Sequence, residues 1–178
     1  MNYAAIYEAD CANGEGMRTS LFVSGCTHHC KGCFNQEAWD FEYGRLYTSG
    51  TEDYILSTLG DEVDGLSILG GEPFEMRNLG KLYWLMRRVK DAGKTLWVYT
   101  GYTWEQLLDR ESVRKWGDRS ITMCALRQID VLVDGPFILE EKDISLRFRG
   151  SRNQRIIDVR KSLKEGRVVL WEGCKDGN

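Results

Sequence analysis

Several features that mark common protein classes are scarce or missing in this sequence. Proline occurs only twice, as Pro73 and Pro136, each close to glycine in a predicted loop. The 24 lysines and arginines do not outnumber the 27 aspartates and glutamates, so the basic excess of a nucleic-acid-binding protein is missing. No apolar run approaches the roughly 20 residues of a membrane span, and residues 1–10 lack the basic start of a secretory signal. We therefore expect a cytoplasmic protein that binds neither nucleic acid nor membrane.

The length and composition are those of an ordinary globular protein. The 178 residues, 42% hydrophobic and 29% charged, suffice to bury a core without disulfide staples. No repeat, low-complexity tract or linker interrupts them, so we predict a single domain over residues 1–178. Disulfide frameworks belong mainly to small secreted chains. Three of the six cysteines lie close together, which favours a metal site, whereas isolated Cys11, Cys124 and Cys174 are typical of small buried hydrophobes.

Apolar patterning predicts an α/β fold. Helical spacing of apolar residues favours helices over residues 52–59, 78–90 and 104–109. Short apolar runs bounded by turn residues predict strands over residues 3–7, 20–24, 66–69, 96–100, 131–134, 156–159 and 168–171. Strands that alternate with helices favour a mostly parallel sheet. An eight-stranded barrel usually takes about 250 residues, so we predict an open, incomplete (β/α)6-type partial barrel, with its chemistry at the carboxyl ends of the strands.

Three cysteines share one short loop after the second predicted strand. Cys26, Cys30 and Cys33 have the spacing C-x3-C-x2-C, and Gly25 and Gly32 give the loop backbone freedom. Thiolates suit both iron–sulfur clusters and zinc. Structural zinc sites usually pair two C-x2-C elements, and no second pair is present. A cluster with three cysteine ligands leaves one iron open, which is typical of a catalytic site. A zinc-binding interaction module stays open as the alternative, with His28 and His29 expected to be solvated or to lie around the ligands.

This spacing resembles the radical-SAM superfamily. The resemblance implies a 4Fe-4S cluster held by Cys26, Cys30 and Cys33, whose open iron binds S-adenosyl-L-methionine (SAM) and whose electron cleaves SAM to a 5′-deoxyadenosyl radical. The superfamily often has an aromatic residue before the last cysteine, where this chain has Gly32. Phe34 is therefore expected to cover the cluster or the adenine instead.

A second loop supports that resemblance. Gly70, Gly71, Glu72 and Pro73 follow the predicted strand 66–69, and two glycines let the backbone approach a ligand closely. Alone, this pattern also fits an ordinary strand-to-helix turn. At its distance from the cysteines it resembles the GGEP motif of the superfamily, which implies that these residues bind the ammonium group of SAM.

Further segments narrow the resemblance to one family. Residues 13–18, 96–102, 129–137 and 149–158 resemble, in this order, the activating protein of anaerobic (class III) ribonucleoside-triphosphate reductase. The resemblance covers about residues 2–161 and leaves the tail 162–178 without an assigned role. It implies a radical-SAM oxidoreductase that installs a glycyl radical on that reductase, with a flavodoxin- or ferredoxin-type electron donor. The alternative enzyme is an activase of another glycyl-radical enzyme, such as pyruvate formate-lyase.

The same resemblance suggests roles for other polar residues. Thr100 and Asp134, at predicted strand ends, are expected to hold the methionine part of SAM or a cation beside it, although Asp134 also fits a turn-initiating residue. Ser151, Asn153 and Gln154 could hydrogen-bond the ribose or adenine, or form a polar loop. Arg18 could pair with a carboxylate or with the cluster's negative charge, or lie on the surface.

Overall fold

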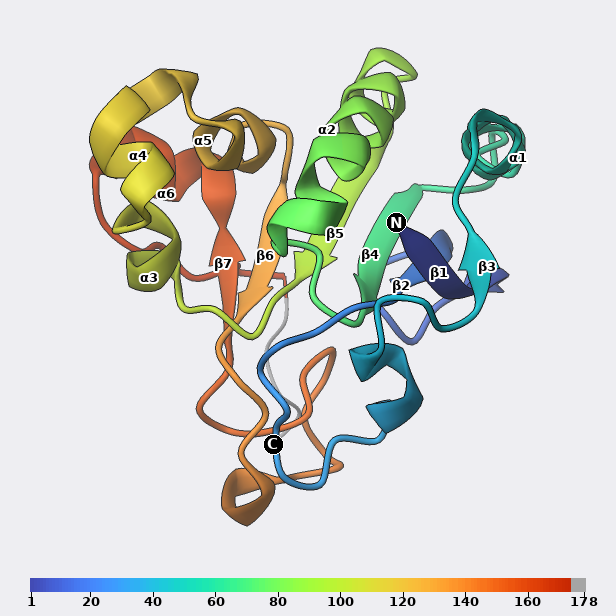
Figure 1. Cartoon of the computed structure of the whole chain (residues 1–178). Coiled ribbons are helices and arrows are strands. Elements are labelled where there is room, and N and C mark those ends of the chain that lie inside the picture. Colours follow the sequence, from blue (N-terminus) through green and yellow to red (C-terminus); the bar gives the residue numbers. More distant parts are fainter. Residues whose placement is uncertain (174–178) are drawn as a thin grey trace.

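The computed structural model describes residues 1–173, apart from the side chain of residue 112. In this part of the chain one sheet of seven strands has the order β3-β1-β2-β4-β5-β6-β7 (Figure 1). The strands are β1 (Asn2–Asp10), β2 (Arg18–Val23), β3 (Arg45–Leu46), β4 (Gly65–Gly70), β5 (Thr95–Tyr99), β6 (Val131–Asp134) and β7 (Arg155–Asp158). Six of the predicted strands are thereby confirmed. Residues 168–171 instead make only an isolated bridge between Leu170 and Ile157.

Six α-helices connect or follow these strands in the described residues. They are α1 (Ser49–Ser57), α2 (Met76–Asp91), α3 (Trp104–Leu108), α4 (Glu111–Trp116), α5 (Ile121–Leu126) and α6 (Val159–Glu165), with short 3-10 turns at Gln36–Trp39, Gly117–Arg119 and Leu139–Glu141. The three predicted helices correspond to α1, α2 and α3. The apolar stripe of α2 is buried, as its spacing predicted. No helix among the described residues is long and apolar enough to cross a bilayer.

The sheet is mixed and does not close. Strands β2, β4, β5 and β6 run parallel, whereas β1 pairs antiparallel with β2 and β7 antiparallel with β6. The α/β class and the open sheet are confirmed. The expected series of six β/α units is not confirmed, because the chain reverses direction at both ends of the parallel region.

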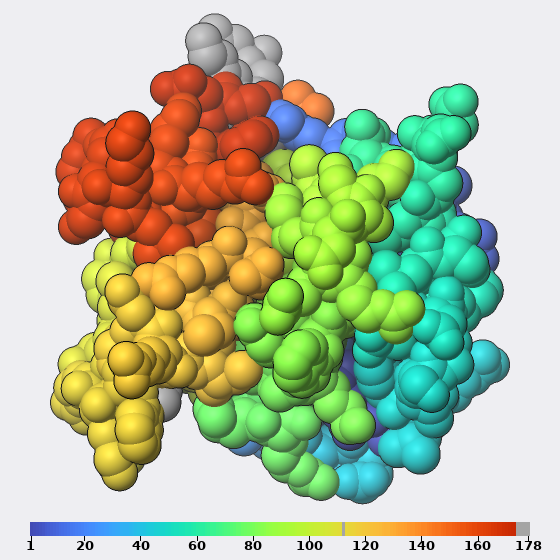
Figure 2. Space-filling view, turned by 90° about the horizontal axis from the view of Figure 1, so that it is seen from above, coloured from blue at the N-terminus to red at the C-terminus, as the bar shows by residue number. Residues whose placement is uncertain are grey.

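The two faces of the sheet bury different side chains. Alternation along each strand sends Leu66 and Ile68 into the large core beneath the helices, whereas Trp97 belongs to a smaller cluster on the other face. Phe148 and Trp171 cover that second face. In the view from above, α2 (green) lies between α1 (teal) and the α4–α5 region (yellow to orange) (Figure 2). Helices therefore close one face, and loops close the other.

The carboxyl ends of the four parallel strands share one edge. They point to the bottom of Figure 1, where the loops after β2 (blue) and β6 (orange) gather. Chemistry in open α/β sheets is usually located at such an edge. The sheet thus brings together the loops that carry the cysteines, the Gly-Gly-Glu-Pro segment and residues 135–154.

Candidate active site

The three motif cysteines lie on a loop that two backbone hydrogen bonds hold in place. Gly25 N donates to Ala38 O at 2.8 Å and Cys26 N donates to Trp39 O at 3.1 Å. Cys33 N donates to Cys30 O at 3.1 Å, which makes a tight turn between the last two cysteines. All three line one cavity of about 140 Å³ at the carboxyl edge of the sheet. The structure thus places the three predicted ligands together.

Two of the thiols in this cavity, those of Cys26 and Cys30, are poor acids without a cation. Burial raises the pKa of the Cys26 thiol to about 11 and also raises the pKa of the Cys30 thiol. Both therefore keep their protons at neutral pH. A bound metal reverses this preference, since it replaces the proton and stabilises the thiolate.

The donor set fits an iron–sulfur cluster. Among residues 1–173, no three or more His, Cys, Asp or Glu side chains are grouped so as to hold a metal ion. A 4Fe-4S cluster is larger than an ion, and each cysteine binds a different iron of it. Three soft thiol ligands around one cavity are what such a cluster needs. Cys11 and Cys124 are free thiols elsewhere in the chain, and Cys174 lies outside the described residues.

Glu72 is fully buried at the centre of the site. Its Oε1 accepts hydrogen bonds from Phe74 N and Thr100 Oγ1, both at 2.8 Å. Its Oε2 accepts one from Gly101 N at 2.7 Å and lies 3.1 Å from His28 Nε2. One carboxylate therefore connects the cysteine loop, the β4 loop and the β5 loop. Both of its oxygens are engaged within the protein.

The two glycines before Glu72 are required by the neighbouring backbone. Gly71 N donates to Val23 O at 2.7 Å and Glu72 N donates to Gly25 O at 2.8 Å. A Cβ atom on Gly71 would lie 2.7 Å from Gly25 O, and Gly70 has φ +103°. These glycines admit the cysteine loop and so fix its position against the end of β4. Both also line the cavity, and their expected contact with SAM stays a prediction.

One positioning residue, Asn78, escaped the sequence analysis, and a second, His28, was named there without this role. Asn78, buried in the first turn of α2, donates from Nδ2 to Ser24 O at 2.9 Å and to Glu72 O at 3.0 Å. A polar side chain beside the apolar stripe of a helix was the available signal. His28 was expected to be solvated or near the ligands, and it packs against the Tyr102 ring while contacting Glu72. His29 stacks on Trp39.

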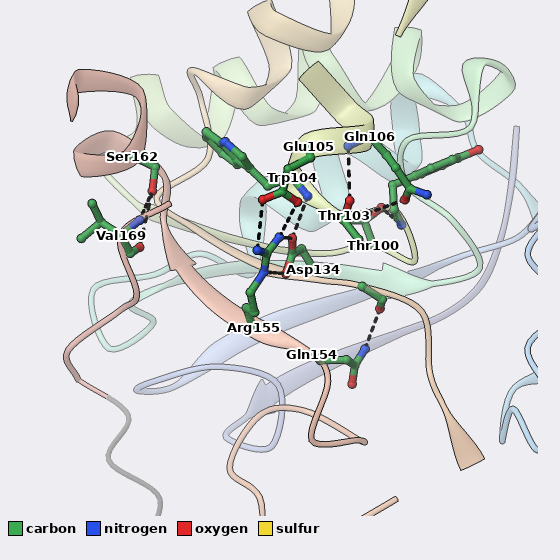
Figure 3. A network of polar contacts seen from close by, with 12 residues as sticks. Thr100, Thr103, Trp104, Glu105, Gln106, Asp134, Gln154, Arg155, Ser162 and Val169 are labelled. Carbon is green, nitrogen blue, oxygen red and sulfur yellow. Dashed lines mark hydrogen bonds and ion pairs between the residues drawn. The ribbon is translucent and has the colours of Figure 1, made fainter. Parts of the chain in front are cut away.

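Thr100 and Asp134, predicted together, lie in different surroundings. Thr100 lines the cavity and donates to Glu72. Asp134 does not face the cavity, because the alternation that turns Val133 to the loop side turns Asp134 to the helices. Its carboxylate accepts hydrogen bonds from Trp104 N at 2.7 Å and from Arg155 Nε at 2.9 Å (Figure 3). We therefore assign Asp134 to a structural ion pair.

The predicted ribose and adenine residues hold their own loop together. Ser151 is buried and its Oγ accepts a hydrogen bond from Ile138 N at 3.2 Å. Asn153 Nδ2 donates to Pro136 O at 2.8 Å, and Gln154 Nε2 donates to Gly135 O at 3.0 Å. Gln154 lines the cavity, and Pro73 and Asn153 are not among its lining residues. Their roles toward SAM stay predictions.

Arg18 is buried at the opposite edge of the sheet, where the parallel strands begin. It is only 1% exposed. Its guanidinium donates to Ser67 Oγ at 2.7 Å, to Thr95 Oγ1 at 2.9 Å and to backbone carbonyls. Burial lowers its pKa to about 10. The expectation that Arg18 faces the cluster or lies on the surface is wrong, because it joins the starts of β2, β4 and β5.

Comparisons with known proteins agree with this geometry. Residues 12–157 match the family described as "4Fe-4S single cluster domain". The chain is 44% identical to the anaerobic ribonucleoside-triphosphate reductase-activating protein of Vibrio cholerae. The aligned region of 161 residues covers 88% of this chain and 97% of the relative. The protein of the same name from Escherichia coli K12 is 38% identical over 165 residues, 90% of this chain and 100% of the relative. The phage T4 protein of that name is 35% identical over 161 residues, 88% of this chain and 93% of the relative. The chain therefore belongs to the 4Fe-4S single cluster domain family and, within it, to the anaerobic ribonucleoside-triphosphate reductase-activating proteins.

Proposed function

We propose that the protein is a radical-SAM enzyme that installs a glycyl radical on anaerobic ribonucleoside-triphosphate reductase. The observation that carries this proposal is the shared cavity of Cys26, Cys30, Cys33 and the Gly70–Glu72 segment. The names of the related proteins indicate the reductase as the partner. When bound, the cluster supplies the electron that splits SAM into methionine and a 5′-deoxyadenosyl radical, and this radical removes a hydrogen atom from a glycine α-carbon.

Different residues of the chain hold the cluster and SAM. The three cysteines bind the cluster, and the backbone of Gly70 and Gly71 receives the ammonium group of SAM. Glu72 positions the site without touching SAM itself. Its carboxylate holds Thr100, Gly101 and His28 in place. Asn78 joins the backbone of the cysteine loop to that of Glu72. The two cofactor-holding loops thus keep a fixed separation, which a reaction between two bound groups requires.

Water exclusion requires help from outside the chain. A reactive radical needs a dry site, and the sheet of this protein stays open. We propose that the reductase closes the site when it docks. The electron comes from a flavodoxin- or ferredoxin-type donor in this scheme.

The test begins with the protein purified under argon. We expect a brown, air-sensitive protein that contains iron and sulfide, and that forms 5′-deoxyadenosine from SAM in the presence of dithionite. Single alanine substitutions of Cys26, Cys30 and Cys33 should each abolish iron binding, because only these thiols line the cavity among the described residues. Cys11→Ala and Cys124→Ala serve as matched controls and should keep iron. A colourless protein with one zinc ion would overturn the proposal.

A further inference from the structure

Two strongly exposed apolar side chains mark the entrance to the site. Phe34, directly after Cys33, is 89% exposed, and Ile144 is 93% exposed. We call these two residues the apolar rim. Both line a cavity of about 500 Å³ whose wall also includes Cys33. Phe34 was expected to cover the cluster or the adenine. It also lines the smaller cavity of the three cysteines, and most of its ring is exposed at the surface.

The larger cavity leads from the rim to the proposed reaction site. It shares Cys33, Leu69 and Tyr99 with the smaller cavity that holds all three cysteines. Its outer wall includes Leu146 and Phe148. A ligand that enters past Ile144 therefore reaches the cysteine loop along a mainly apolar passage.

An unusually long connection supplies Ile144 of this rim. Strands β6 and β7 pair antiparallel and could be joined by a turn of about two to five residues, yet residues 135–154 lie between them. Their chain passes below the sheet edge beside the cysteine loop (Figure 1). A bridge between Lys142 and Ser151 ties its base, and Gln154 Oε1 accepts a hydrogen bond from Gly150 N at 2.8 Å. Long loops held in this way commonly carry function.

The charge of the connection 135–154 differs from that of the whole chain. The connection 135–154 contains four basic residues, Lys142, Arg147, Arg149 and Arg152, against three acids, Glu140, Glu141 and Asp143, so its net charge is +1 in a chain of net charge −3. Lys142 and Arg147 are exposed. A partner segment with acidic residues therefore complements this surface.

We infer that the apolar rim is the docking surface for a flexible, glycine-bearing segment of the reductase. The inference rests on the proposed function, since hydrogen abstraction requires the partner's glycine to come close to the bound SAM. Apolar side chains of the segment cover Phe34 and Ile144, its acidic residues meet Lys142 and Arg147, and its glycine backbone enters the passage. A glycine fits there because it has no side chain and adopts unusual backbone angles. Docking in this position also closes the entrance to water.

The test compares the holoenzyme with Ile144→Ser and Phe34→Ser variants. Purified reductase from the same organism is the probe, and its dissociation constant is measured under argon by calorimetry. We expect each substitution to weaken reductase binding at least about tenfold, as central interface residues do. Ile144→Ser should keep its iron content and its affinity for SAM. Trp84→Ser is the matched control, because Trp84 is also exposed (58%) but lies on α2, and it should bind the reductase like the parent.

The outcomes separate this inference from the proposed function. If the parent cleaves SAM and binds the reductase while both rim variants bind it within about twofold of the parent, the docking surface is wrong and the function stands. If the rim substitutions change only the association of the protein with itself, the surface joins two copies and the inference is again overturned. A parent without iron or SAM cleavage would instead contradict the proposed function.

Discussion

The Glu72 carboxylate receives hydrogen bonds from Phe74 N, Thr100 Oγ1 and Gly101 N while fully buried. Removal of this acceptor leaves several donors without a partner in the interior, and each such group costs about 1–3 kcal/mol. The residue thus matters first for the shape of the site, and through that shape for the binding of SAM.

We predict that Glu72→Ala lowers the free energy of unfolding by at least about 2 kcal/mol and weakens SAM binding. Urea denaturation and equilibrium binding of SAM measure the two effects. Glu62→Ala is the control, because Glu62 is exposed at the other end of β4 and should leave both quantities unchanged. A Glu72→Ala protein with parental stability and reduced SAM affinity would show that the carboxylate binds SAM directly.

Sequence reasoning at this scale succeeded where spacing alone determines geometry. Cys26, Cys30 and Cys33 lie on one loop, so their proximity follows from the chain itself. The direction of the Asp134 side chain depends on the alternation of side chains along β6. It also depends on Arg155, which forms an ion pair with Asp134 from the neighbouring strand β7. A shift of one residue along a strand decides whether the last side chain faces the site or the helices. The sequence pattern did not show which of the two faces Asp134 takes.

Among the secondary-structure elements, the end of β4 illustrates how closely two loops pack. A Cβ atom on Gly71 would meet Gly25 O at 2.7 Å, whereas one on Gly80, in α2, would meet no atom within 4 Å. The same substitution should therefore have opposite effects at the two positions.

We predict that Gly80→Ala raises the free energy of unfolding by about 0.5–1 kcal/mol, because glycine is costly inside a helix. Gly71→Ala should lower it and reduce iron content, since the cysteine loop must move. Urea denaturation and iron analysis of both variants provide the measurement. Full iron content and unchanged stability in Gly71→Ala would contradict the proposed packing of the two loops.

Helix α3 is tied to strands β6 and β7 by an ion-pair network. Arg155 donates to Asp134 and to Glu105, with Arg155 Nη2 2.8 Å from Glu105 Oε2 (Figure 3). The hydrogen bond from Arg155 is the main reason that the pKa of Glu105 falls from 4.5 to about 2. Because the folded-state pKa is the lower one, this carboxylate stabilises the fold above pH 4.5 and loses its contribution as the pH falls toward 2.

We predict that Glu105→Gln lowers stability at neutral pH and that the difference from the parent shrinks as the solution is acidified below about pH 4.5. Urea denaturation across a pH series measures the difference. Glu111→Gln, at an exposed position on α4, should show no such trend. A difference that stays constant with pH would exclude the ion pair as its source.

Element prediction succeeded best where one periodic pattern was long. The buried stripe of α2 determined its helix, whereas α4, α5 and α6 are short and pack mainly through tertiary contacts. Strand direction was harder to predict, since β7 returns antiparallel after the long connection 135–154 and β1 precedes the parallel region. Both ends of the expected barrel therefore differ from a β/α repeat.

Across the whole molecule, the two faces of the sheet serve different purposes. Helices cover one face with a continuous core, and the other face is covered by Phe148, Trp171 and the loops around the site. The open edge leaves the proposed site accessible to a large partner. This arrangement suits an enzyme whose substrate is a segment of another protein rather than a small molecule.

One measurement tests the proposed function most directly. The reductase is prepared with deuterium at the α-carbon of its glycines and is incubated anaerobically with this protein, SAM and a reductant. We predict that 5′-deoxyadenosine acquires deuterium and that the electron paramagnetic resonance doublet of the reductase, split by the remaining α-hydrogen in unlabelled protein, collapses. Production of 5′-deoxyadenosine without deuterium, and without an organic radical on the reductase, would contradict the proposed function.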